Sequence, residues 1–559
     1  MTAISDRTET AGLRTRVTRI AGTALSRLTG TPPPNTTYQV HRGIRIPMRD
    51  GVELIADHFA PDSPEPAGTL LVRGPYGRKW PFSALYASVY ATRGYHVILQ
   101  SVRGTFGSGG EFDPTVNEAE DGADTVAWLR DQAWFTGTFG TIGLSYLGAT
   151  QWALLQDPPP ELAAAVIVVG PHDFADATWG TGSFEVNDFL GWSDLVAHQE
   201  DPHLIRSLIR QARARGIVAR AATGLPLGTA GRDLLGAAAP WWESWVEHSE
   251  PTDPFWDRYR FAAALEHSEV PVLLIGGWQD IFVDQTLQQY RALHDRGVDV
   301  ALTVGPWTHS HMVGKAAPHV LRESLYWLGT HLTGRTTAPR AAVRMCVTGG
   351  GGWIELADWP PATSTEVRHL GVDGRLTQQP DIGNHSARST FVFDPQNPTP
   401  TIGGRLLSPS SGRRRDDQLA GRDDTIVFTS AQLSADLFVL GAPVVELVHD
   451  ADTSHVDLFV RISEVDAKSR SRNVSDGYLR LQPDRESGLV RLELDPIAHR
   501  FAAGTRIRLV IGGGSFPRFA RNLGTGESVL EGAWMVSATH VITHEGSRLL
   551  LPARTSLPS

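Results

Sequence analysis

One serine stands where a buried strand is predicted to turn sharply into a helix. Residues 138–148 read TFGTIGLSYLG, which places Ser145 between an apolar run and a helical run. Such a turn holds the serine hydroxyl clear of the sheet, and the helix behind it aims backbone N–H groups at developing negative charge. The segment departs from strict G-x-S-x-G, since Leu147 takes the second glycine position and Gly148 follows. We expect Ser145 to be a nucleophile, although a serine between glycines is also a common turn.

A nucleophilic serine needs a base and an acid that orients the base, and two later segments supply them. Asp280 and His309 each follow an apolar run that reads as a strand. Open α/β sheets place their sites at the carboxyl ends of strands, and the order serine, acid, histidine is the one that this type of fold uses. His309 would take the serine proton and Asp280 would hold the imidazole. His311 is a rival base, and Asp284 is a rival acid.

The same residues allow a metal site as an alternative interpretation. Asp280, His309 and His311 are potential ligands, but no third well-spaced ligand segment and no H-E-x-x-H motif accompany them. Residues 104–110 are rich in glycine, yet no Gly-Lys-Ser/Thr follows, so a tight turn is favoured over a phosphate loop. The single cysteine, Cys346, excludes an intrachain disulfide and a thiolate-based metal site. We therefore expect neither a metal nor another cofactor.

Acyl transfer also requires two hydrogen-bond donors for the oxyanion. The backbone N–H of Tyr146, directly after the serine, supplies one. The loop after the predicted strand 69–72 should supply the other, and the hydroxyl of Tyr76 is a candidate. By its chemistry alone, Tyr76 could equally be a packed loop aromatic.

The elements that must position these residues divide the chain into distinct parts. Between residues 38 and 174, and again between 270 and 304, apolar strands alternate with helical runs, which implies a mostly parallel sheet covered on both faces. The alternation of strands and helices stops between about residues 174 and 259, where the helical spacing of apolar residues indicates a cap. After about residue 337, short β runs with frequent turns predict a β-sandwich or jelly roll.

Composition limits the partners. The formal net charge of −10 argues against nucleic acid as a main partner, because phosphate binding needs concentrated positive charge. No apolar run reaches 18 residues, so no membrane-spanning helix is expected. The N-terminus lacks a continuous apolar core and does not resemble a secretory signal, so the cytoplasm is the expected location. The partner we expect is a small-molecule ester, and a homo-oligomer is left open.

Five segments together resemble the cocaine esterase / X-prolyl dipeptidyl-peptidase family. The segments are Gly143–Gly148, Ala149–Trp152, Gly74–Tyr76, Gly277–Asp280 and Gly305–His309. The resemblance covers nearly the whole chain beyond the first forty or so residues, and Leu147 fits this family's usual form of the motif. It implies a triad of Ser145, Asp280 and His309, with the Tyr76 hydroxyl and the Tyr146 amide as the oxyanion hole. It also implies an α/β-hydrolase domain with a helical cap insertion and a C-terminal β jelly-roll domain.

The predicted division follows from pattern and resemblance together. It comprises an N-terminal arm and linker (1–36), a first hydrolase part (37–174), a helical cap (175–259), a second hydrolase part (260–337) and a jelly-roll β-sandwich domain (338–559).

The resemblance extends to the substrate pocket. Trp179 and Trp192 are similar to aromatic positions that line the acyl pocket in the cocaine esterase branch, and aromatic walls suit an apolar or aryl acyl group. Phe282 is expected to join them. In the amino-acid ester hydrolase branch, acidic residues follow the catalytic aspartate, whereas this chain has Ile281 and Phe282 there. An acyl esterase is therefore predicted. An acylase or X-prolyl dipeptidyl-peptidase with the same triad is the alternative, and an inert binding protein is a more distant one.

Overall fold

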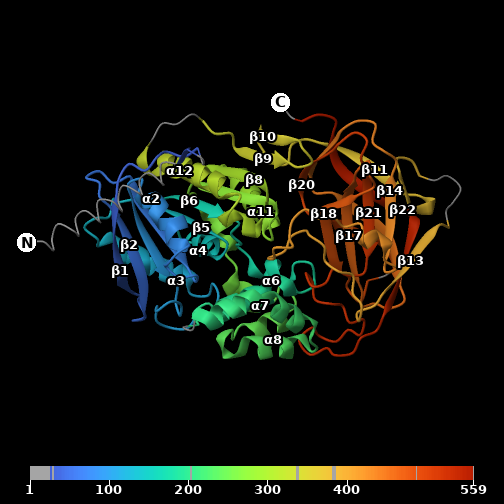
Figure 1. Ribbon diagram of the computed structural model, residues 1–559, viewed down its shortest axis with the longest axis horizontal. Coiled ribbons are helices and arrows are strands. Elements are labelled where there is room, and N and C mark those ends of the chain that lie inside the picture. The colour runs from blue at the N-terminus through green and yellow to red at the C-terminus, as the bar shows by residue number, and fades with distance from the viewer. Residues whose placement is uncertain are drawn as a thin grey trace, which may run out of the picture.

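The computed structural model describes residues 26–27, 30–201, 204–334, 339–380, 386–485 and 487–557, with backbone alone for 204–209, 211 and 212. Most of the predicted N-terminal arm therefore lies outside the described residues. Figure 1 shows a sheet flanked by helices, a helical part beside it, and an all-β part at the other end of the molecule.

The first sheet has ten strands in the order β1-β2-β4-β3-β5-β6-β7-β8-β9-β10. The run from β4 to β9 is parallel, and β1, β2 and β10 are antiparallel to their neighbours. The chain order reverses direction between β3 and β5, which is the position where open α/β sheets bind ligands. The strands are β1 Tyr38–Pro47, β2 Glu53–Pro61, β3 Gly68–Gly74, β4 Tyr95–Ser101, β5 Phe139–Leu144, β6 Leu162–Val168, β7 Val272–Gln279, β8 Val300–Thr308, β9 Val343–Val347 and β10 Gly352–Leu356.

The predicted domain boundary after residue 337 is wrong for this sheet. β9 pairs in parallel with β8, and β10 pairs with β9, so both strands extend the hydrolase sheet instead of opening the C-terminal domain. The alternating run Val343–Val347 is compatible with an edge strand in either sheet, and the pairing partner is not encoded in that run.

Helices cover both faces of the sheet, as predicted for buried parallel strands. On one face α3, α4 and α11 share a hydrophobic core, and on the other face the η1/α2 segment and α12 pack against a second core. The helices are η1 Ser83–Ser88, α2 Val89–Ala91, α3 Glu118–Arg130, α4 Tyr146–Leu154, α11 Val283–Asp295 and α12 Ala317–Thr333, with the short η4 His309–Val313 after β8.

The segment between β6 and β7 forms the cap, and its core is aromatic. The side chains of Trp179, Trp242, Trp245 and Trp256 are all almost fully buried there. This confirms the predicted helical insertion. Its helices are α5 Phe174–Trp179, α6 Val186–His198, α7 Leu204–Thr223, α8 Leu227–Leu235, η2 Gly236–Ala238, α9 Trp242–Glu247, η3 Pro254–Tyr259 and α10 Ala262–His267.

The C-terminal part is all β and has its own hydrophobic core. The long strand β22 pairs with β11, β13, β15 and β16, and so joins strands from most of the domain. The strands are β11 Ser364–Leu370, β12 Arg375–Thr377, β13 Arg388–Phe393, β14 Thr425–Ser430, β15 Leu437–Gly441, β16 Val444–Ala451, β17 Asp457–Val465, β18 Ser471–Arg480, β19 Gly488–Glu493, β20 Ile497–Phe501, β21 Arg506–Gly512 and β22 Ala538–Arg554, with the turns η5 Val372–Gly374 and η6 Leu419–Gly421.

Buried arginines join the three parts. Arg405 of the β domain lies 2.5 Å from Asp284 at the start of α11 and 3.0 Å from Asp495 of its own domain. Arg518 of the β domain reaches Glu185, at the start of α6, over 3.4 Å. Arginine suits such sites because its planar fork can engage more than one acceptor. The β domain is therefore tied both to the sheet domain and to the cap.

Glycines allow β5, α4 and β6 to approach each other closely. A Cβ on Gly143 would lie 2.4 Å from Cβ of Leu147, and a Cβ on Gly148 would lie 2.6 Å from Cα of Gly170. Neither position has room for even a methyl group. The close approach fixes the start of α4 against the end of β5, where Ser145 lies.

We predict that Gly148→Ala destabilises the protein by about 1–3 kcal/mol, because the new methyl group meets the backbone of Gly170 and forces α4 away from β6. The shift of the urea unfolding midpoint measures this. Gly216→Ala is the matched control, since Gly216 is exposed within α7 and a Cβ added there would meet no atom within 4 Å. Alanine at that position should be neutral or stabilising by about 0.5–1 kcal/mol. Equal midpoints for Gly148→Ala and wild type would contradict this account of the packing.

Candidate active site

Ser145 occupies the residue between β5 and α4 in a backbone conformation that favours glycine. Its φ is 57° and its ψ is −123°. Its N–H donates to the carbonyl of Val168 at 2.9 Å, and its carbonyl accepts from the N–H groups of Gly148 and Ala149. A non-glycine residue in such a region costs about 1–3 kcal/mol and persists where the surroundings over-determine it, which is common at functional sites. The predicted sharp turn at Ser145 is confirmed.

Asp280 and His309 are joined by a short hydrogen bond. His309 Nδ1 lies 2.6 Å from Asp280 Oδ1, and the other carboxylate oxygen, Oδ2, accepts from the N–H of Phe282 at 2.8 Å. The Asp280 side chain is completely buried. An ionised carboxylate can only accept, so the Nδ1 nitrogen carries the proton and Nε2 is left as the basic nitrogen.

The two rivals are engaged elsewhere. Asp284 pairs with Arg405 at the domain junction. The ring of His311 takes part in the cap of its own short helix, where its Nδ1 accepts from the N–H of Thr308 at 3.3 Å. Neither contact resembles the bond between Asp280 and His309.

Tyr76, in the loop after β3, reaches Ser145. Ser145 is close enough to the Tyr76 hydroxyl to lower its pKa, and Trp192 Nε1 of α6 donates to the Tyr76 hydroxyl oxygen at 3.0 Å. Burial raises the pKa of Tyr76 to about 12, against the opposing effects of Trp192 and Ser145. The phenol therefore stays protonated at neutral pH and can donate. The adjacency of β3 and β5 in the sheet places this loop beside Ser145.

Tyr146 is held by a buried charged network that the sequence did not reveal. Its hydroxyl donates to Glu118 Oε1 at 2.9 Å and accepts from the N–H of Thr115 at 2.7 Å. Glu118 Oε2 in turn lies 2.9 Å from the guanidinium of Arg73, and both side chains are almost fully buried. Burial raises the pKa of Glu118, whereas the charge of Arg73 and the bond from Tyr146 lower it. The one sequence signal for this network was Arg73, a charged residue in an otherwise apolar strand.

Aromatic rings surround the two tyrosines. The ring of Trp192 stacks on Tyr146 with centroids 6.0 Å apart and an interplanar angle of 11°, and Phe112 packs against both rings. Phe282 lies edge-on to the imidazole of His309, with centroids 5.6 Å apart. The structure therefore brings Trp192 and Phe282, two of the predicted pocket residues, next to the proposed catalytic residues.

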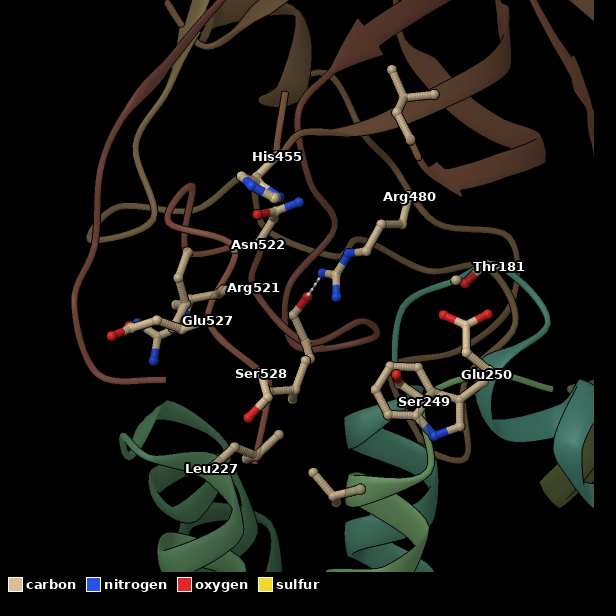
Figure 2. A pocket seen from close by; sticks show the side chains of 18 of the residues that line it. Thr181, Leu227, Ser249, Glu250, His455, Arg480, Arg521, Asn522, Glu527 and Ser528 are labelled. Carbon is tan, nitrogen blue, oxygen red and sulfur yellow. Dashed lines mark hydrogen bonds between the residues drawn. The ribbon is translucent and has the colours of Figure 1, made fainter. Parts of the chain in front are cut away.

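Trp179, the third predicted pocket residue, lies in a different setting. Its indole N–H donates to the carbonyl of Trp245 at 2.8 Å, and the residue lines a cavity of about 460 Å³ between the cap and the β domain. Figure 2 shows this cavity, with Arg480 and Asn522 on one side and Glu250 on the other. No contact found among the described residues joins Trp179 to Ser145, so its substrate role stays a prediction.

Two absences apply to the described part of the chain. Within it, no group of three or more His, Cys, Asp or Glu side chains is arranged to hold a metal ion. None of its helices is both long and apolar enough to cross a membrane. The cytoplasmic location stays a prediction, and the oligomeric state stays open.

We predict that Glu118→Gln costs about 3–5 kcal/mol, because it leaves the buried Arg73 charge without its counter-ion. Chemical unfolding followed by tryptophan fluorescence measures the loss. In the control Glu161→Gln, the ion pair with Arg130 lies at the surface, and its removal should cost less than about 1 kcal/mol. Similar costs for the two variants would contradict the structural role of the Arg73–Glu118 pair.

Known proteins resemble this chain along nearly its whole length. A model described as X-Pro dipeptidyl-peptidase (S15 family) matches residues 50–311, and one described as X-Pro dipeptidyl-peptidase C-terminal non-catalytic domain matches residues 335–549. The cocaine esterase of Rhodococcus sp. (strain MB1 Bresler) is 30% identical over 568 residues, which covers 92% of this chain and 98% of the relative.

Solved structures show the same fold. An aminopeptidase from a marine sediment Thaumarchaeota archaeon has a TM-score of 0.79, and an α-amino acid ester hydrolase has one of 0.78, each at 21% identity and over 94% of this chain. The matches cover 98% and 99% of those two chains. They support the α/β-hydrolase domain followed by an all-β domain. On the strength of the cocaine esterase alignment, the chain belongs to the cocaine esterase / X-Pro dipeptidyl-peptidase family of serine hydrolases.

Proposed function

We propose that this protein hydrolyses carboxylic acyl esters through an acyl-enzyme intermediate on Ser145. The observation that carries the proposal is the strained turn that holds Ser145 at the carboxyl edge of the sheet, next to the buried, protonated Tyr76 whose pKa it lowers. A phenol donor beside the serine is suited to stabilise a negative charge that forms there during acyl transfer. The bond between Asp280 and His309 supplies the base and its orienting acid.

The proposed reaction uses each group at a defined atom. His309 Nε2 accepts the Ser145 proton as Oγ attacks the acyl carbon, and the N–H of Tyr146 and the O–H of Tyr76 donate to the oxyanion. Asp280 accepts from Nδ1 and stabilises the imidazolium. The imidazolium then protonates the leaving alcohol. In the second half, Nε2 takes a proton from water as the water oxygen attacks the acyl carbon. The imidazolium then returns the proton to Oγ as the acyl–Oγ bond breaks, which releases the carboxylic acid and restores Ser145.

Aromatic rings support an apolar or aryl acyl group. Trp192 and Phe282 lie beside the reacting groups and are almost fully buried. Such walls favour apolar substrates because they gain burial and ring contacts. Ile281 and Phe282 present no carboxylate to a substrate ammonium group. An acylase or X-prolyl dipeptidyl-peptidase activity with the same residues is the second candidate, favoured by the S15 family match.

We expect wild type to hydrolyse p-nitrophenyl acetate, butyrate and benzoate. We expect kcat of Ser145→Ala to fall by a factor on the order of 10⁶, because alanine has no hydroxyl that could form the acyl-enzyme. A matched anilide series measured alongside separates the two candidates, with faster ester cleavage expected. Most activity retained in Ser145→Ala would exclude the serine as nucleophile. A preference for anilides would make the amide-cleaving function the better one.

Tyr76→Phe should lower kcat by roughly 10²–10³, because it removes one oxyanion donor and leaves the aromatic ring in place. KM should change little, since the hydroxyl acts on the charged state and not on the bound ester. Steady-state kinetics on the best p-nitrophenyl ester measures both constants. A near-normal kcat in this variant would mean that Tyr76 is only a packed aromatic.

A further inference from the structure

Cap helix α6 contacts both residues proposed to bind the oxyanion. From this helix, Trp192 donates its indole N–H to the Tyr76 hydroxyl oxygen at 3.0 Å and stacks its ring on that of Tyr146. At the end of the same helix, Gln199 Nε2 donates to the carbonyl of Pro75 at 2.9 Å. The cap therefore holds the loop that carries Tyr76 at two adjacent residues.

The direction of the hydrogen bond from Trp192 determines what Tyr76 can do. An indole nitrogen only donates, whereas a phenol has one O–H to donate and lone pairs with which to accept. Because Trp192 occupies an acceptor position on the oxygen, the Tyr76 O–H is left to donate in another direction, and Ser145 is close enough to affect the pKa of Tyr76. Stacking by Phe82, with centroids 5.4 Å apart and an angle of 18°, fixes the plane of the phenol ring.

The indole of Trp192 is itself held in place by the cap core. Trp245 stacks on it with centroids 6.1 Å apart and an angle of 8°, and Trp241 packs against it at 6.0 Å. Only 9% of Trp192 is exposed. Ring packing, much of it within the cap, therefore helps to set the direction of its N–H.

We propose that Trp192 is a positioning residue that aligns the Tyr76 hydroxyl, so that the oxyanion hole is complete only with α6 packed against the Tyr76 loop. This assigns Trp192 a role beyond lining an acyl pocket. The inference rests on the proposed function, because it needs Tyr76 to act on an oxyanion at Ser145. Small misplacements of a donor suffice to lower a rate, since a shift of about 1 Å can cost on the order of 10²-fold.

A double-mutant cycle tests the proposal. Trp192→Phe is made with Tyr76 present and again in the Tyr76→Phe background, and kcat and KM are measured on the same p-nitrophenyl ester. With Tyr76 present, we expect kcat to fall about 10- to 100-fold and KM to change less than about threefold. In the Tyr76→Phe background the same change should cost less than about threefold, because the hydroxyl that Trp192 aligns is already gone.

Trp242→Phe serves as the matched control, since it also removes a buried indole N–H, one that donates to the carbonyl of Gly228 within the cap. Its kcat should fall less than about threefold. If Trp192→Phe fails to fold, 3-benzothienylalanine at position 192 removes only the N–H and should reproduce the kcat loss. Equal losses in both Tyr76 backgrounds, or a change in KM alone, would overturn the proposal. Activity that survives Ser145→Ala would instead overturn the proposed function itself.

Discussion

The junction between β5 and α4 imposes the constraint on which the rest of the site depends. Ser145 has a φ of 57° there, and its backbone N–H and carbonyl are both occupied, by β6 and by the first turn of α4. The conformation costs free energy that the packing of the strand and helix must offset. That packing requires the glycines at 143 and 148, because a side chain at either would meet atoms within 3 Å. A relaxed turn would remove the serine hydroxyl from the position that Tyr76 reaches.

Groups from separate elements meet around this junction. Sheet order brings the end of β3, with Tyr76, beside the end of β5, and places Asp280 and His309 after the neighbouring strands β7 and β8. The cap and the β domain contact each other next to this site. Asp188 on α6 accepts from the N–H of Leu407 at 2.8 Å, and burial raises the pKa of Asp188 against the smaller, opposing effects of this bond and of the nearby Arg518 and His309. The site is therefore built by all three parts of the chain.

Two features of the site could be predicted from local sequence pattern. The turn at Ser145 followed from glycine spacing between an apolar strand and a helix, and the pairing of Asp280 with His309 followed from their places after successive strands. The Arg73–Glu118–Tyr146 network was missed because its partners lie in three elements and a carboxylate at a helix start is ordinarily solvated. The pairing of β9 with β8 was missed because a short alternating strand does not identify its neighbour.

If the proposed function holds, Ser145 is the activated nucleophile of this chain. A fluorophosphonate reacts with an activated serine, and mass spectrometry of the digested protein locates the adduct. We expect one adduct per chain, on the peptide that contains Ser145, and no labelling when the protein is unfolded before the reaction. An unlabelled folded protein, or an adduct on another residue, would exclude Ser145 as the activated nucleophile.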